Sequence, residues 1–355
     1  MNDDFEHECT SWMLFPKYTG GKRLLHKNRD ADARGIVLYK SQPGVAHKWL
    51  AVGNDGKTNM VLNDCGLACV MNSGEATFEN EEDVKGRMST PRIAQDLAEN
   101  CSTAAEAVAR FKGIIAKRLY THKRRGSIFF IMDTKTGYIV ECTAHHVFPA
   151  RVTGGMAIRA NIWHNFGISR YSQNEPNSTL NSASREMQVR IGLNEALDKR
   201  GIITLQDIWR TTRMRGDEAL MGNKSGVCNK RTNSAATIES DAEFPDVLSA
   251  IFVTIGPPAH TAYLPVPCCL SKVPKEIADG SWSAAAFERG DKFGLDFDDS
   301  IWLPLEDEMI KVFAAAQSSA RELLRNGNRK EAIVLMNKAF DKCFKLANPL
   351  VLKKL

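Results

Sequence analysis

The chain has 355 residues, of which 43% are hydrophobic and 25% charged, a composition that excludes general disorder. Its net charge of +5 is too small and too scattered to favour a nucleic-acid partner. No run approaches the roughly 18 apolar residues of a membrane span, and nine cysteines without regular spacing argue against a disulfide framework.

Short strands separated by turns are predicted for the N-terminal quarter of the chain. Apolar or β-branched runs alternate there with turn-forming residues such as Gly20-Gly21 and Asn54-Asp55-Gly56. Because the runs are short and closely spaced, they indicate antiparallel β-structure. The expected strands are Trp12–Pro16, Leu24–Lys27, Gly35–Lys40, Trp49–Gly53, Asn59–Leu62 and Leu67–Met71.

Helices and a hairpin are predicted next. Thr90 followed by a proline opens a helix that reaches about Asn100, and a capping box from Thr103 to Glu106 opens a second helix. A hairpin, a polar loop at 165–183, two helices, two strands and a broken helical region follow. Their ranges are Ser127–Met132 with Tyr138–Thr143, Ser184–Lys199, Thr204–Arg210, Ala235–Glu239, Val247–Ile255 and Leu305–Ala347, the last interrupted near Asn326–Asn328.

Five short motifs stand in a recognisable order along this framework. They are Cys9-Thr10, Lys27-Asn28-Arg29-Asp30, Asn63-Asp64-Cys65-Gly66-Leu67-Ala68 running on to Asn72, Arg159-Ala160-Asn161, and Ser182-Ala183-Ser184-Arg185. In this order the chain resembles the N-terminal-nucleophile (Ntn) amidohydrolases. The similar branches are the choloylglycine hydrolases with penicillin V acylases, and the acyl-CoA:6-aminopenicillanic acid acyltransferases. The motifs cover residues 9–190, with weaker likeness at Gly256-Pro257, Tyr263 and Pro265.

The resemblance implies an α+β fold, a four-layer αββα sandwich of two antiparallel sheets. Residues 1–8 are then a propeptide or N-terminal extension, residues 9–303 form the sandwich, and residues 304–355 add a helical C-terminal segment. Homo-oligomers are common in this family, so the resemblance leaves a homo-oligomer open. The first residues lack the basic start and apolar core of a secretory signal, and a cytoplasmic location is therefore expected.

Cysteine is the least weak nucleophile at neutral pH, and a terminal α-amine near it can accept its proton. The resemblance makes Cys9 this nucleophile, with its own α-amine as the base. A free amine requires a cut between Glu8 and Cys9, so the chain as written is expected to be a precursor. No histidine, metal or cofactor is needed for this chemistry.

The resemblance also assigns roles to four further residues. Asp30 holds the α-amine, Asn72 donates to the oxyanion, Asn161 is a second positioning amide, and Arg185 ties the site together from a helix. Taken singly, Asp30, Asn72 and Arg185 are better explained as turn, loop and surface residues, and only their joint order favours the functional roles. Lys27 stands where the bile-salt branch has arginine, so any shared role at this position, such as substrate binding, stays open.

The expected function is hydrolysis of a non-peptide C–N amide bond in a small molecule through a Cys9 thioester. One alternative is an acyltransferase that passes the same acyl group to an amine. Another is a non-catalytic binding protein that keeps residues 1–8. A zinc site built from Cys65, Cys69 and His145-His146 lacks the usual second ligand pair and is not favoured. Cys268-Cys269 is expected to be buried packing, and no nucleotide-binding motif is present.

Overall fold

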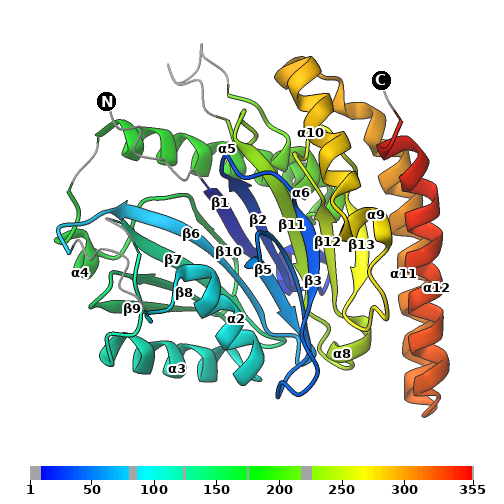
Figure 1. Cartoon of the computed structure of the whole chain (residues 1–355), viewed down its shortest axis with the longest axis horizontal. Helices are drawn as coiled ribbons and strands as arrows, with labels where there is room; N and C mark the ends of the chain where they lie inside the picture. The colour runs from blue at the N-terminus through cyan, green and yellow to red at the C-terminus, as the bar shows by residue number, and fades with distance from the viewer. Residues whose placement is uncertain (1–8, 80–85, 123–124, 174–175, 217–225, 354–355) are drawn as a thin grey trace.

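Two antiparallel sheets covered by helices make up the fold (Figure 1). The computed structural model describes residues 9–79, 86–122, 125–173, 176–216 and 226–353. The sheets pack face to face, and helices lie on the outer face of each. The α+β class and the four-layer sandwich expected from the sequence are therefore confirmed.

Six strands form the first sheet. They are β1 (Cys9–Leu14), β2 (Leu24–Asp30), β10 (Met156–Arg159), β11 (Thr232–Glu239), β12 (Ala250–Thr254) and β13 (Leu264–Pro267). Their order across the sheet is β10-β1-β2-β11-β12-β13, and all neighbours are antiparallel. Strand β1 therefore lies inside the sheet, with β10 on one side and β2 on the other.

Seven strands form the second sheet, and they follow one another across it in chain order. They are β3 (Val37–Lys40), β4 (Trp49–Asn54), β5 (Lys57–Asn63), β6 (Ala68–Ala76), β7 (Arg125–Met132), β8 (Gly137–Cys142) and β9 (Val147–Val152). Such a meander needs only short connections between strands. The longest connection, between β6 and β7, carries the two helices that cover this sheet.

Those two helices are α2 (Thr90–Asn100) and α3 (Ala104–Ala116), and their apolar faces pack on the outer side of the second sheet. The outer side of the first sheet is covered by α5 (Pro176–Arg200), α6 (Leu205–Thr212), α11 (Leu303–Arg325) and α12 (Arg329–Val351) (Figure 1). The other helices of the described residues are α1 (Pro16–Thr19), α4 (Phe166–Ser169), α8 (Pro245–Leu248), α9 (Lys275–Ala278), α10 (Ser281–Phe293) and two 3₁₀ turns, η1 (Gly294–Asp296) and η2 (Asp299–Trp302). No helix of the described residues is long and apolar enough to cross a membrane.

Alternation along the strands sorts side chains between the layers, because successive residues of a strand point to opposite faces. On β1, Trp12 faces the helices and stacks on His26 with ring centroids 4.1 Å apart. Its neighbour Met13 faces the other sheet, where its sulfur lies close to Gly137. The odd-numbered residues of β1 therefore point between the sheets, and Cys9 is one of them.

The helix starts predicted at Thr90, Thr103 and Thr204 are confirmed, and Thr103 and Thr204 both form capping boxes with reciprocal hydrogen bonds. The helix predicted from Ser184 begins earlier, at Pro176. The break in the C-terminal helical region is also confirmed, because α11 ends at Arg325 and α12 begins at Arg329. The strand expected at Val247–Ile255 is shorter than predicted, since α8 occupies its first residues.

The loop predicted at 165–183 is wrong, because α4 and the first part of α5 lie in this stretch. The error has a physical cause. The buried side of α5 begins with Ser182, Ser184 and Arg185 rather than with apolar residues, whereas Leu180 and Met187 are exposed. A helix whose buried face is polar gives no hydrophobic periodicity to detect.

The C-terminal helices share the core of the sandwich. Phe313 of α11 packs edge-on against Phe252 of β12. Arg213, which follows α6, forms a fully buried two-point ion pair with Glu306 of α11, at 2.9 and 2.6 Å. The backbone N–H of Tyr263 donates to the same carboxylate at 2.9 Å. The segment expected at 304–355 is thus bonded directly to the strands it covers.

Candidate active site

Cys9 begins β1 at the edge of the space between the two sheets, and only 6% of it is exposed. In the register of β1 with β2, Cys9 pairs with Arg29 and Ser11 pairs with Lys27. Directly paired residues point to the same face of a sheet, so these four side chains share the face turned toward the second sheet. The candidate nucleophile therefore lies in a polar cluster at one end of an otherwise apolar interior.

The main chain of Cys9 is held by the two residues that the resemblance places around it. Its nitrogen donates to Asn161 Oδ1 at 2.9 Å, and its carbonyl oxygen accepts from Arg185 Nη1 at 2.7 Å. Arg185 is itself 1% exposed, and its second terminal nitrogen donates to Asn161 Oδ1 at 2.9 Å. It also donates to Thr10 Oγ1 at 3.0 Å. The three predicted residues are therefore in direct contact, and Arg185 and Asn161 fix the position of the first strand.

Two glycines that the sequence analysis did not single out leave room for the loop that carries Asn161 to pack against the second sheet. A Cβ atom at Gly126 would lie 2.0 Å from the Trp163 ring, and one at Gly74 would lie 2.6 Å from its indole nitrogen. Only glycine leaves room for this ring. Asn161 Nδ2 then reaches Ser73 O at 2.7 Å, which joins the loop to β6. In the sequence, the glycine that follows Ser73 indicates this close approach, because glycine in a strand often marks such a site.

Lys27 lies at the centre of the cluster and is 1% exposed. Its ammonium nitrogen donates to Met71 O at 2.6 Å and to Asn72 Oδ1 at 3.0 Å. Burial lowers the pKa of Lys27, while the nearby Cys9 opposes that shift. The residue that departs from the pattern of the resembled family thus lies where its charge acts on the thiol.

Asn72 connects the two sheets. Its Oδ1 accepts from Lys27 and, at 2.7 Å, from Ser11 Oγ, while its Nδ2 donates to Arg159 O at 3.0 Å and Ala160 O at 2.9 Å. This orientation of the amide is fixed, because carbonyl oxygens only accept and an ammonium only donates. The strand predicted at Leu67–Met71 is too short, since β6 continues through Asn72 to Ala76 with a bulge.

The oxyanion role of Asn72 remains a prediction, and it requires the side-chain amide of Asn72 to change its hydrogen bonds. Both amide hydrogens are engaged by carbonyl oxygens, so donation to an oxyanion requires one of these bonds to be given up. In the structure described, Asn72 positions Lys27 and the strand end before Asn161.

Replacing Asn72 by alanine should therefore destabilise the fold as well as lower activity. Two buried carbonyls and the Lys27 ammonium would lose partners, each at a cost of about 1–3 kcal/mol. Urea unfolding should show the free energy of unfolding reduced by at least about 2 kcal/mol. If Asn72→Ala unfolds like the wild type while kcat falls, Asn72 acts as an oxyanion donor and not as a structural link.

Asp30 is fully buried and lies one residue beyond Arg29, the cross-strand partner of Cys9. Its Oδ2 accepts from Asn229 Nδ2 at 3.0 Å. The nitrogen of Cys9 donates to Asn161, and the role of Asp30 in holding the α-amine stays a prediction. The predicted cut follows Glu8, which lies outside the described residues.

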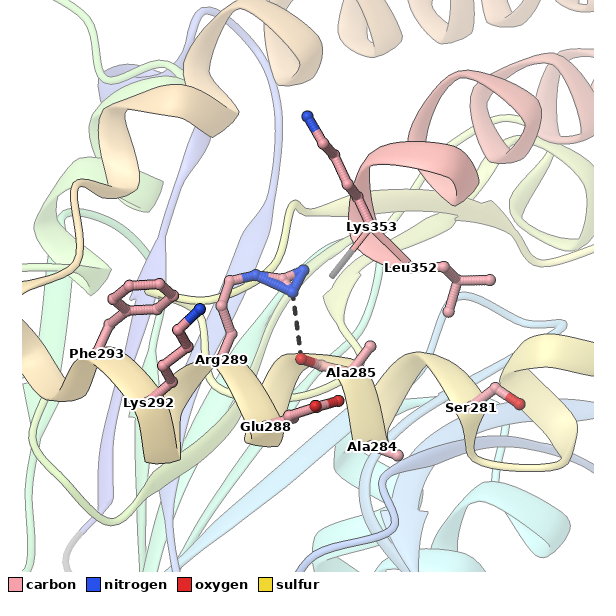
Figure 2. Close-up of a pocket in the computed structure, with 9 residues that line it drawn as sticks. All are labelled: Ser281, Ala284, Ala285, Glu288, Arg289, Lys292, Phe293, Leu352 and Lys353. Atoms are coloured by element: carbon pink, nitrogen blue, oxygen red, sulfur yellow. Dashed lines mark hydrogen bonds between the residues drawn. The ribbon is translucent and has the colours of Figure 1, made fainter. Parts of the chain in front are cut away.

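A separate hollow of about 350 Å³ lies between α10 and the end of α12 (Figure 2). Its lining includes Glu288 and Arg289, and Figure 2 shows Arg289 reaching back toward Ala285. The guanidinium donates to Ala285 O at 3.2 Å and to Val351 O at 2.6 Å, in the last turn of α12. A cation there satisfies carbonyls at a helix C-terminus, which is a structural role.

Neither a protein-family model nor a curated protein matches this sequence. Among solved structures, the fold is similar to a conjugated bile acid hydrolase from Clostridium perfringens, with 14% identity, a TM-score of 0.44, and coverage of 68% of this chain and 88% of that one. It is also similar to penicillin V acylase from Agrobacterium tumefaciens, with 13% identity, a TM-score of 0.43, and coverage of 69% and 85%. A third is the Caenorhabditis elegans ortholog of N-acylethanolamine-hydrolyzing acid amidase, with 12% identity, a TM-score of 0.43, and coverage of 65% and 92%. Likenesses this distant say nothing on their own about the activity of the chain.

Proposed function

We propose that the chain is a cysteine amidohydrolase of the Ntn type, which cleaves a C–N amide bond in a small molecule through a Cys9 thioester. The observation that carries the proposal is the bonding of Cys9. Its nitrogen and oxygen are bound by Asn161 and Arg185, and the charge of the buried Lys27 acts on its side chain. This support is built from residues far apart in the sequence, and a cysteine that only fills space needs none of it.

The proposed reaction has two halves. The Cys9 sulfur bonds to the amide carbonyl as the thiol proton passes to a base, and the amine leaves after it receives that proton. Water then adds to the thioester, the C–S bond breaks, and the acid leaves as the thiol is restored. If an amine replaces water in the second half, the same site performs acyl transfer.

In the proposed active chain residues 1–8 have been removed, so that the nitrogen of Cys9 is a free α-amine. Asn161 Oδ1, 2.9 Å from that nitrogen, then accepts one of the amine hydrogens. This leaves the amine lone pair available for the thiol proton, which is the role that the resemblance assigns to it. The buried carboxylate of Asp30 supplies negative charge near the same strand end.

The buried charge of Lys27 supports a second part of the mechanism, which is stabilisation of the thiolate after the α-amine has taken the thiol proton. Two contacts of Lys27, Met71 O and Asn72 Oδ1, can only accept, so each takes one hydrogen of the ammonium. Burial lowers the pKa of Lys27 and the charge of Cys9 opposes that shift, so the ammonium and a thiolate stabilise each other.

Lys27→Met should therefore slow alkylation of Cys9 by iodoacetamide at neutral pH, because no cation remains to stabilise the thiolate. Lys27→Arg is the matched control, since it keeps the charge and should keep the alkylation rate. The other titratable groups near Lys27 are Arg29, Asp30 and His26, which both variants leave in place. Equal alkylation rates for Lys27→Met and the wild type would exclude this role.

One experiment tests the proposed function. The purified chain is incubated with a panel of N-acyl amides, quenched with acid, and examined by intact mass and by peptide mapping. We expect active protein to begin at Cys9 and to carry the acyl increment on the peptide that starts there. Adding an amine acceptor separates hydrolysis from transfer by the products formed. Full activity from a chain that retains Met1 would contradict the proposal.

A further inference from the structure

Three metal-ligand side chains meet at the turn between β5 and β6, away from the cysteine site. His47 lies just before β4, and Asp64 and Cys65 lie in the turn itself. Cys65 and Asn72 are seven residues apart, which is about 20 Å along an extended strand. The cluster therefore does not belong to the candidate active site, and nothing in the proposed mechanism uses it.

The three candidate ligand atoms form a compact triangle. His47 Nδ1 lies 3.3 Å from Cys65 Sγ and 3.3 Å from Asp64 Oδ1, and Cys65 Sγ lies 3.8 Å from Asp64 Oδ1. Tetrahedral zinc, with bonds of about 2.0–2.1 Å to nitrogen and oxygen and about 2.3 Å to sulfur, holds nitrogen and oxygen about 3.3 Å apart and sulfur about 3.5 Å from each. All three spacings agree with this geometry to within about 0.3 Å.

The surrounding contacts orient the same three atoms toward one point. Ser102 Oγ lies 3.1 Å from His47 Nε2, and an Nε2–H that donates to it leaves the Nδ1 lone pair directed at the cluster. The backbone N–H of Lys48 donates to Asp64 Oδ2 at 3.0 Å, which turns Oδ1 inward. Outer hydrogen bonds of this kind are typical of metal-binding histidines and carboxylates.

The charge and exposure of the cluster also suit a divalent cation. A thiolate, a carboxylate and a neutral imidazole together carry two negative charges, which balance Zn²⁺. The side chains of His47 and Asp64 are 22% and 28% exposed, so an ion can enter and a water molecule can complete the tetrahedron. The nitrogen, oxygen and sulfur donor set favours zinc over magnesium or calcium.

We propose that His47, Asp64 and Cys65 bind one Zn²⁺ ion, with water as the fourth ligand. The site joins the segment before β4, the β5–β6 turn and, through Ser102, the connection between α2 and α3. It differs from the zinc site rejected in the sequence analysis. Cys69 packs in the core under α2 and α3, and His146 instead contacts Glu79 and Tyr171.

The rival explanation is a hydrogen-bonded cluster without a metal. Burial raises the pKa of the Cys65 thiol, the contact with Ser102 opposes this, and the charge of Asp64 adds to the rise. A protonated thiol donating to His47 Nδ1 would account for that contact, whereas zinc must displace the proton. The two explanations therefore differ in whether a metal binds and in whether sulfur is one of its ligands.

The test is Co²⁺ and Zn²⁺ binding by the full chain after treatment with a chelator. We expect about one ion per chain, and Co²⁺ should give the thiolate charge-transfer band of a tetrahedral site. His47→Ala and Cys65→Ser should weaken binding at least about 100-fold, and Cys65→Ser should abolish the band. Ser102→Ala should weaken binding about tenfold. His145→Ala, a histidine outside the cluster, is the matched control and should bind like the wild type.

Failure to bind either ion in the wild type, or equal binding by His47→Ala, would overturn the proposal. The band in the wild type identifies sulfur as a ligand even if a cysteine variant does not fold. Because the readout is metal content and cobalt absorbance, the outcome is independent of whether Cys9 hydrolyses amides.

Discussion

Replacing Cys9 by alanine is expected to abolish amide hydrolysis and acyl transfer together, with a loss in kcat on the order of 10⁶-fold. In the proposed mechanism both reactions pass through the same C–S bond, so no other side chain can substitute for the sulfur. The fold should survive, because Asn161 and Arg185 bind the main chain of Cys9 and not its side chain. Steady-state rates on a cleavable amide and far-UV circular dichroism provide the measurement.

Cys268→Ser is the control for this result. Cys268 is partly buried, and its sulfur lies 3.5 Å from Asn63 O at the end of β5. It should keep the wild-type rate. If Cys9→Ala retains activity, or if Cys268→Ser loses as much as Cys9→Ala does, then Cys9 is not the nucleophile.

Glu306→Gln should produce the largest loss of stability, about 3–5 kcal/mol in the free energy of unfolding. The substitution preserves size but leaves the buried Arg213 guanidinium without its counter-charge. It also weakens the acceptor of the Tyr263 N–H. Urea denaturation measures the change as a lower transition midpoint at an unchanged slope.

Glu308→Gln is the matched control, because Glu308 lies on the exposed side of the same helix. Its change should stay within about 0.5 kcal/mol. If both variants unfold like the wild type, α11 is not fixed to the sandwich by this ion pair. If Glu306→Gln gives a second, separate transition, the C-terminal helices unfold as a unit of their own.

Much of the fold was open to prediction because its signals are local. The capping boxes at Thr103 and Thr204 each indicate a helix start within four residues. In the hairpin at 127–143, two strand-forming runs flank a turn. These features depend on the chain near them. The start of α5 was missed because its buried face is polar. The end of β6 was missed because Ser73-Gly74 has the composition of a turn, whereas β6 continues through it with a bulge between Ser73 and Ala76.

The candidate site was predictable only as a set of residues in order. Cys9, Asn161 and Arg185 are brought into contact by the pairing of β1 and the docking of α5, which no local pattern encodes. The burial of Lys27 near Cys9 was not foreseen, because a lysine in place of the family's arginine suggested a lost function. In the fold the lysine is buried, and its charge and that of Cys9 act on each other.

Three consecutive residues that could act as nucleophiles, Cys9, Thr10 and Ser11, open β1, yet only the first is available for attack. Thr10 points to the helices, where its oxygen accepts from Arg185, and Ser11 is bound to Asn72. A protease that trimmed one residue too many would therefore yield an inert chain rather than a threonine hydrolase. Recovering activity would require the whole strand to slip by one position, and that slip would move Trp12 from the helix layer into the space between the sheets.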